Sequence, residues 1–266
     1  MADGTKCHSQ QDEVNFHDMN ITLNKDEVAD TGETTLLDVN VDGSWADTAA
    51  GLRDTETIAE EAFLVSDAEE TLVNAFCQGD VSCHQLDLVH LPRTVSFHLW
   101  DDDAFPLEER KQIAAEVAND VFHLKNSVAK HRSVGEFANI NHRIKTTRER
   151  LRQLVRQLKQ LDSPETARSH RRWEPSILRF SGLATLGTTA PWTSNAVERA
   201  MGEVSKHCKN QWMRWTAPGL ESVLTLKLVR YANPTQFKEF EDELLDRFTK
   251  TTLTMLVSAT GNSGEL

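Results

Sequence analysis

The stretch between Pro106 and Pro164 constrains the fold of this chain more than any other. Apolar residues recur there at helical spacing in two long series, with arginines and lysines on the other faces. Pro164 interrupts the pattern, and a third helix is expected over about 165–183. The apolar series are Leu107, Ile113, Val117, Val121, Leu124 and Val128, then Phe137, Ile140, Ile144, Leu151, Leu154, Leu158 and Leu161. The spacing predicts an all-helical block over 105–183.

The region before this block has short segments with strand character. Residues 14–23 and 34–41 alternate apolar and polar side chains around a polar, glycine-containing stretch, which predicts a hairpin. The short apolar run at 62–67 ends in an acid and predicts a buried strand. A further strand is expected at 84–90, and helices are expected over 44–61 and through Leu72, Val73 and Phe76. The order β–β–α–β–α–β predicts an α/β unit on a mixed sheet.

The C-terminal part returns to helical spacing. A helix is expected from near Asn195, with Val197, Met201, Val204 and Cys208 as its apolar stripe. Two more helices are expected over 219–232 and 235–249, followed by a frayed tail.

Charge divides the chain into unlike regions. Residues 1–109 carry 25 acids and 4 bases, residues 110–232 carry 22 bases and 10 acids, and the net charge is −12. Such asymmetry predicts a nucleic-acid partner for the basic part. The acidic surplus has two interpretations, a solvated acidic surface or adaptation to a high-salt cytoplasm.

Cysteine usage and hydropathy indicate a soluble, cytoplasmic protein. The four cysteines have no spacing typical of a disulfide framework, no apolar leader precedes them, and no apolar run of about 18 residues could span a membrane. The group Cys77, Cys83, His84 and His90 matches no tetrahedral zinc pattern.

Three acids stand out by context. Asp3 precedes a glycine near a strand, Asp67 ends the apolar run at 62–67, and Glu198 lies in the first turn of the helix after Asn195. Carboxylates at the ends of adjacent strands, joined by one from a helix across the sheet, would bind one or two Mg²⁺ ions. Each acid also has a simpler interpretation: solvation for any of them, a helix cap for Asp67, and a capping-box position for Glu198 with Asn195 as N-cap.

The basic residues favour either a solvated face or contact with DNA phosphates. In the C-terminal helix region, Trp212 and Trp215 are either core residues or part of a surface that grips DNA. The residues expected to contact DNA are Arg148, Arg152, Arg156, Arg199, Lys206, Lys209, Trp212 and Arg214.

The segment TSNAVERAMGEVSKHCKNQWMRW resembles the terminal catalytic helix of DDE transposases of the Mutator-like superfamily, in the branch found in haloarchaeal insertion sequences. The resemblance implies an RNase H-like catalytic domain with an Asp on the first strand, an Asp after the fourth strand and a Glu on a late helix. The matching residues here are Asp3, Asp67 and Glu198, with the helical block between the second and the third. It also implies a salt-adapted host.

The resemblance further implies a domain plan and partners. Residues 1–104 would begin the RNase H-like domain, 105–190 would be an all-helical insertion, and 191–250 would close the domain, leaving 251–266 as a disordered tail. Two Mg²⁺ or Mn²⁺ ions would serve cleavage of double-stranded DNA at the element's ends and strand transfer into target DNA. The chain would act as a homo-oligomer on DNA, with His90 and Asn195 as auxiliary residues.

Two departures from the family pattern keep alternatives open. Many members carry Cys-x2-His after the second Asp, and here Asp87 stands where the cysteine would be while His90 keeps its place. The chain also begins two residues before Asp3, so either a truncated copy of an element or a start codon assigned too late is expected. The alternatives are a non-catalytic DNA-binding remnant, and an RNase H-like nuclease that cuts but does not join.

Overall fold

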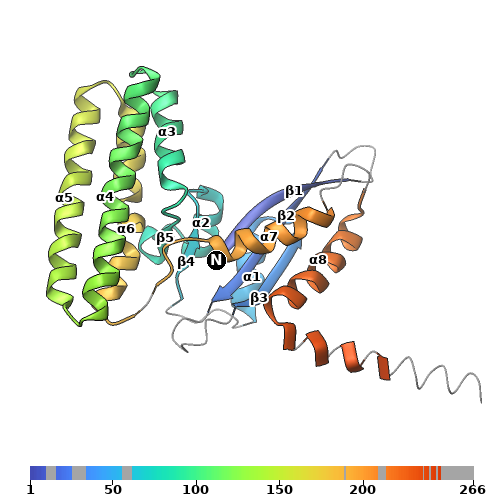
Figure 1. Ribbon diagram of the computed structural model, residues 1–266. Helices are drawn as coiled ribbons and strands as arrows, with labels where there is room; N and C mark the ends of the chain where they lie inside the picture. The colour runs from blue at the N-terminus through green and yellow to red at the C-terminus, as the bar shows by residue number, and fades with distance from the viewer. Residues whose placement is uncertain are drawn as a thin grey trace, which may run out of the picture.

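A computed structural model describes residues 1–9, 16–25, 34–55, 62–188, 190–208, 214–235, 237–239, 241–243 and 245–246. The chain forms a sheet-containing part and a bundle of long helices, and the short β4–β5 pair with α2 lies between them (Figure 1). The strands are β1 (Ala2–His8), β2 (Phe16–Lys25), β3 (Thr34–Val41), β4 (Leu64–Ser66) and β5 (His84–Leu86). The helices are α1 (Trp45–Asp54), α2 (Glu70–Cys77), the 3₁₀ turn η1 (Val81–Cys83), α3 (Leu91–Asp101), α4 (Leu107–Ser133), α5 (Phe137–Gln160), α6 (Pro164–Thr185), α7 (Asn195–Cys208) and α8 (Ala217–Ala232).

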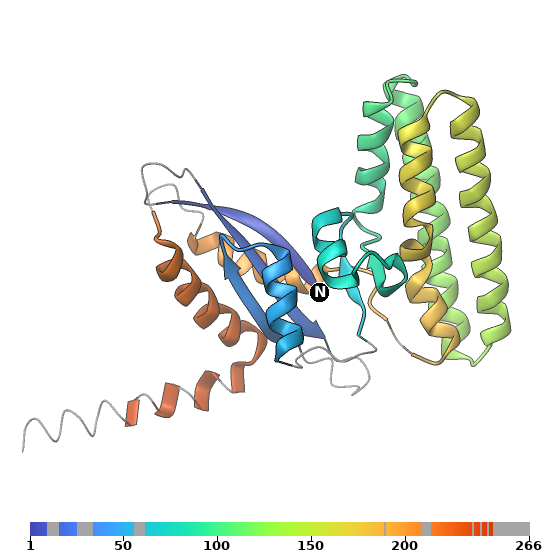
Figure 2. The same ribbon diagram turned by 180° about the vertical axis from the view of Figure 1, so that it is seen from behind.

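Strands β1, β2 and β3 form an antiparallel sheet with β2 in the centre. Because side chains alternate along a strand, one face carries Met19, Ile21 and Leu23, and all three are fully buried. Helices α7 and α8 pack on that face, and α1 covers the other, as the two opposite views show (Figures 1 and 2). This core holds α7, and therefore Glu198, across β1 and β2.

Strands β4 and β5 form a separate, parallel pair with Leu64 opposite His84. All three residues of each strand are buried, as expected for parallel strands covered on both faces. β4 also lies beside β1, although no bridge between these two strands is found in the described part of the chain. The acid that follows β4, Asp67, is thus brought next to the start of β1.

Helices α3, α4, α5 and α6 form the bundle, and its apolar stripes meet in one core that continues to β4 and β5. Helix α6 connects the bundle to the strands, because the Phe180 amide donates to Gln85 Oε1 (2.6 Å) and Ser176 Oγ donates to the Val81 carbonyl (3.1 Å). Pro175 is tolerated within α6. The bundle is therefore anchored directly to the parallel strand pair.

The structure confirms the α/β class and the helical block. The three helices expected between 105 and 183 are α4, α5 and α6, and α8 matches the helix expected over 219–232. Within 234–246 the described residues are helical, while the tail at 251–266 lies outside the described residues. No helix that the structure describes is both long and apolar enough to cross a membrane.

Two expectations about the strands were wrong, and a third strand was expected only from the resemblance. The strand expected at 84–90 ends at Leu86, because the chain turns there into α3. Residues 2–8 form a full strand, although the alternation of side chains alone did not indicate one. This polar segment is a strand because it pairs with β2 along its length. The single mixed sheet is divided into a three-stranded antiparallel sheet and a two-stranded parallel one.

The cysteine spacing did not indicate a disulfide, but the structure contains one. Cys77 and Cys83 are bonded, with their Cα atoms 5.7 Å apart. Helix α2 ends at Gln78 in the left-handed conformation, followed by Gly79 at φ +86°, and this turn brings the chain back so that the two cysteines meet. The pairing depends on that turn, which cysteine spacing alone does not reveal.

Candidate metal centre

The three predicted acids lie where the start of β1, the end of β4 and the first turn of α7 come together (Figure 1). Asp3 is opposite Ile21 in the β1–β2 register, so it shares the face that α7 covers. Asp67 directly follows β4, and Glu198 is the fourth residue of α7. Three elements that are far apart in sequence thus supply one carboxylate each.

The charges of the other two acids act on Asp3. Burial raises the pKa of the Asp3 carboxyl to about 6, and the charges of Asp67 and Glu198 push it in the same direction. The Gly4 amide, which donates to Asp3 Oδ1 at 2.8 Å, and the nearby His90 oppose this rise. Asp3 is therefore within electrostatic reach of both other acids, in a place where negative charge is costly.

His90 joins this group of carboxylates. It immediately precedes α3, and its Nε2 lies 2.8 Å from Glu198 Oε1. The two side chains are 33% and 34% exposed, so the pair is open to solvent on one side. Asp87, His90 and Glu198 each offer a ligand atom within 4.8 Å of the others, which is a spacing that a metal ion could bridge.

Asp87 differs from the other acids because its oxygens are already occupied. It is fully buried, and Oδ1 accepts from the Val89 amide (2.6 Å). Oδ2 accepts from Thr193 Oγ1 (3.0 Å), the Ser194 amide (2.7 Å) and Ser194 Oγ (2.6 Å). Four donors satisfy this buried carboxylate, so its structural role is to tie the end of β5 to the start of α7.

Asp67 is the most open of the three predicted acids. Its side chain is exposed, and Oδ1 accepts from the Glu69 amide at 3.2 Å. Partial desolvation and the charges of Glu69 and Asp87 raise its pKa. The helix-cap interpretation of Asp67 is not supported directly, because Glu69 rather than Asp67 occupies the N-cap of α2. The bond to Glu69 instead forms a local turn that holds Asp67 at the end of β4.

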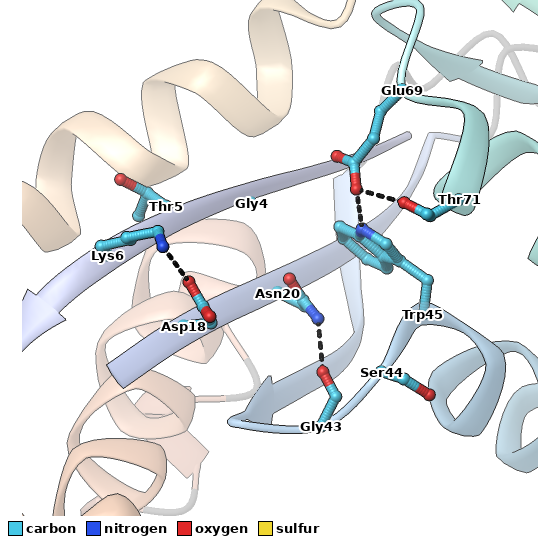
Figure 3. A pocket seen from close by; sticks show the side chains of 10 residues that line it. All are labelled: Gly4, Thr5, Lys6, Asp18, Asn20, Gly43, Ser44, Trp45, Glu69 and Thr71. Atoms are coloured by element: carbon cyan, nitrogen blue, oxygen red, sulfur yellow. Dashed lines mark hydrogen bonds and ion pairs between the residues drawn. The ribbon is translucent and has the colours of Figure 1, made fainter. Parts of the chain in front are cut away.

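A polar hollow of about 650 Å³ lies on the opposite face of β1 (Figure 3). Gly4 forms its floor, since a Cβ there would meet Asn20 Oδ1 at 3.1 Å and Trp45 at 3.5 Å. The surrounding groups satisfy one another: Lys6 pairs with Asp18 (3.4 Å), Asn20 Nδ2 donates to the Gly43 carbonyl (2.9 Å), and Glu69 Oε1 accepts from Trp45 Nε1 (2.9 Å) and Thr71 Oγ1 (2.7 Å). The acids that could hold a metal are therefore on the α7 face.

The interpretation of Asn195 as the N-cap of α7 was wrong, while its auxiliary role stays a prediction. Helix α7 begins at Asn195, so Ser194 holds the capping position, and its carbonyl accepts from the Val197 and Glu198 amides. Ser194 Oγ also lies 3.3 Å from Glu198 Oε1. Sequence reasoning missed Thr193 and Ser194 as the partners of Asp87, although hydroxyl residues before a helix are a known signal.

The predicted DNA-contacting residues have different environments. Arg148 and Arg152 both form ion pairs with Glu174 on α6, at 3.3 and 2.9 Å. Lys206 pairs with Glu203 at 2.6 Å within α7. Arg156, Arg199 and Arg214 are exposed, while Lys209 and Trp212 lie outside the described residues.

Trp215, which had a core and a DNA-binding interpretation, packs against the core under α7 and α8. Its carbonyl lies 2.9 Å from His17 Nε2, and its backbone forms a bridge to Ser9. Trp215 is therefore a partly buried residue at the edge of this core.

Comparison of the chain with protein-family models, with curated proteins and with solved structures finds no match.

Replacing Asp87 with Asn is expected to lower the free energy of unfolding by roughly 2–4 kcal/mol, because an amide nitrogen would face donors that now have an acceptor. Chemical denaturation at neutral pH measures this change. The matched variant Glu198→Gln, at a half-exposed position, should change stability by less than about 1 kcal/mol. Equal effects of the two substitutions would show that Asp87 does not anchor α7.

Replacing Asp3 with Asn is expected to stabilise the protein at pH 7.5 by roughly 1–2 kcal/mol. The pKa of Asp3 is raised from 3.8 to about 6 in the folded state, so folding binds a proton between these values and the wild type loses stability as pH rises through them. The gain from Asn should therefore vanish near pH 4. Urea titrations at several pH values test this, with Asp54→Asn on α1 as an exposed control that should show no such trend.

Proposed function

We propose that this chain carries the catalytic domain of a DDE transposase, which cleaves DNA at the ends of a mobile element and transfers the strands by phosphoryl transfer. The observation that carries the proposal is that Asp3 lies within electrostatic reach of Asp67, Glu198 and His90, which come from distant elements. Of the described residues, Asp87, His90 and Glu198 form the group whose ligand atoms lie within 4.8 Å of one another. Burial and the neighbouring charges make the ionised form of Asp3 unfavourable. This cost favours a cation site over a merely solvated surface.

The order of the elements supports an RNase H-like domain. The first acid lies on β1, the second directly after the fourth strand, and the third on a late helix that packs on the sheet. The four-helix bundle of α3–α6 occupies the interval between the second and third acids. This is the order that the resemblance to Mutator-like transposases implies.

The residues present suit Mg²⁺ or Mn²⁺. Carboxylate oxygens are the ligands these hard cations prefer, and Asp3, Asp67 and Glu198 would hold them while leaving positions for water and phosphate. Two such ions would activate the attacking hydroxyl and stabilise the leaving oxygen of an in-line displacement. His90 orients the Glu198 carboxylate through their 2.8 Å contact, and Asp87 keeps the first turn of α7 in place through Ser194.

Double-stranded DNA is the substrate that charge favours. The surplus of bases between 110 and 232 and the exposed Arg156, Arg199 and Arg214 supply cations for phosphate contacts. The protein would act in the cytoplasm as a homo-oligomer that pairs two DNA ends.

A cleavage assay on supercoiled plasmid carrying the element's ends tests the proposal. Wild type in Mg²⁺ or Mn²⁺ at high KCl should nick and join DNA, and Glu198→Gln should reduce the rate at least a hundredfold by removing a carboxylate ligand. Glu203→Gln, five residues further along α7 and paired with Lys206, is the matched control and should retain activity.

The products separate the proposal from its alternatives. Nicking without joined products would identify an RNase H-like nuclease. DNA binding without any metal-dependent cleavage, equal in wild type and Glu198→Gln, would identify a DNA-binding remnant and overturn the proposed activity.

A further inference from the structure

Helix α3 exposes an aromatic stripe, defined as Arg93, Phe97 and Trp100. These residues follow one another at spacings of four and three, so they lie along one face of the helix. Phe97 is 58% exposed and Trp100 is 63% exposed. The opposite face of the helix packs in the bundle core, where Leu91, Val95 and Leu99 are buried.

Such exposure is unusual for the largest apolar side chains. Phe and Trp normally bury most of their surface, and their exposure on adjacent helical turns leaves apolar area in water that a partner could cover. The packing of α3 on α4 and α6 fixes the helix, so the two rings are presented from a rigid support.

The helix that carries the stripe begins at the candidate metal centre. His90, which contacts Glu198 at 2.8 Å, is the residue directly before α3. At a rise of about 1.5 Å per residue, Phe97 lies roughly 10 Å and Trp100 roughly 15 Å along the axis from His90. With stacked bases about 3.4 Å apart, these distances correspond to about three to five nucleotides from a phosphate at the centre.

We propose that the aromatic stripe binds unpaired nucleotides of the DNA strand next to the phosphate that is cut. The inference rests on the proposed function and adds a site for single-stranded DNA to it. Phe97 and Trp100 offer faces on which bases stack, and Arg93, at the end nearer the metal centre, offers a cation for a phosphate.

Charge at the far end of the stripe limits the length of strand that can bind. Asp101 and Asp103 are exposed just beyond Trp100, and they would repel phosphates that continued along the helix. Asp102 is engaged elsewhere, because its carboxylate accepts from the Glu165 and Thr166 amides at the start of α6. The stripe therefore accommodates a short unpaired segment rather than a long duplex.

Fluorescence anisotropy with a labelled oligothymidine and with a duplex of equal length tests the proposal. EDTA is present, so cleavage plays no part. The double variant Phe97→Ala/Trp100→Ala should bind oligothymidine at least tenfold more weakly and the duplex less than about threefold more weakly, because it lacks the two faces on which unpaired bases stack. Trp100→Phe should retain most of the affinity, since it keeps an aromatic face.

Val134→Ala/Leu186→Ala is the matched control, because these two residues are 64% and 78% exposed and follow the C-terminal ends of α4 and α6, whereas it is the start of α6 that contacts the end of α3. It should bind oligothymidine like wild type, and thermal unfolding should show that all variants fold. Unchanged affinity of the aromatic double variant, or no binding by wild type, would overturn the proposal.

Sedimentation velocity at several protein concentrations provides a second test that could overturn the proposal. If wild type self-associates and the aromatic double variant is monomeric with unchanged oligothymidine affinity, the stripe is a contact between copies of the chain and the inference is wrong. The proposed function fails in a different way. In that case wild type shows no metal-dependent nicking, although its binding of oligothymidine still depends on Phe97 and Trp100.

Discussion

The buried carboxylate of Asp87 is the interaction on which the arrangement of the candidate metal centre depends. It joins the end of β5 to the start of α7, although the bundle separates these elements in sequence. The Leu88 amide adds a backbone bond of 3.0 Å to the Trp192 carbonyl. The segments before and after the inserted helices therefore meet at one place. For this reason α7 can pack on β1 as it would without the insertion. An uncompensated buried charge would be strongly destabilising, and the four donors to Asp87 offset that cost.

The bundle reinforces this junction. Trp192, which leads into α7, contacts Phe122 edge to face and lies under the Lys125 ammonium, 4.4 Å from the ring centroid. On the other side, α6 is bonded to η1 and β5. A displacement of the bundle would therefore move β5 and the segment before α7 together. This shared movement keeps His90 and Glu198 in contact and makes the bundle a support for the centre as well as a candidate DNA-binding element.

Local pattern predicted the helices well, because their apolar spacing is set within each segment. It predicted β1 poorly, since a strand as polar as residues 2–8 is defined by its pairing with β2. Asp3, Asp67 and Glu198 could be singled out from motif context and from the resemblance, but the four donors of Asp87 could not. Thr193 and Ser194 are more than a hundred residues away from it in sequence, and only the closed insertion brings them together. The Cys77–Cys83 bond was missed for a related reason, since it depends on a left-handed turn at Gln78.

The raised pKa of Asp3, to about 6, connects stability with the candidate chemistry. Burying the Asp3 carboxyl near two other carboxylates lowers stability at neutral pH, and a bound cation would offset both the cost of burial and the smaller repulsion between the charges. Asp3 lies near the start of β1, beside β4, where no backbone bridge joins the two sheets within the described residues. A cation held by Asp3 and Asp67 would therefore link these strands at the point where backbone pairing does not. The same ions that the proposed reaction requires would then also complete the sheet that positions them.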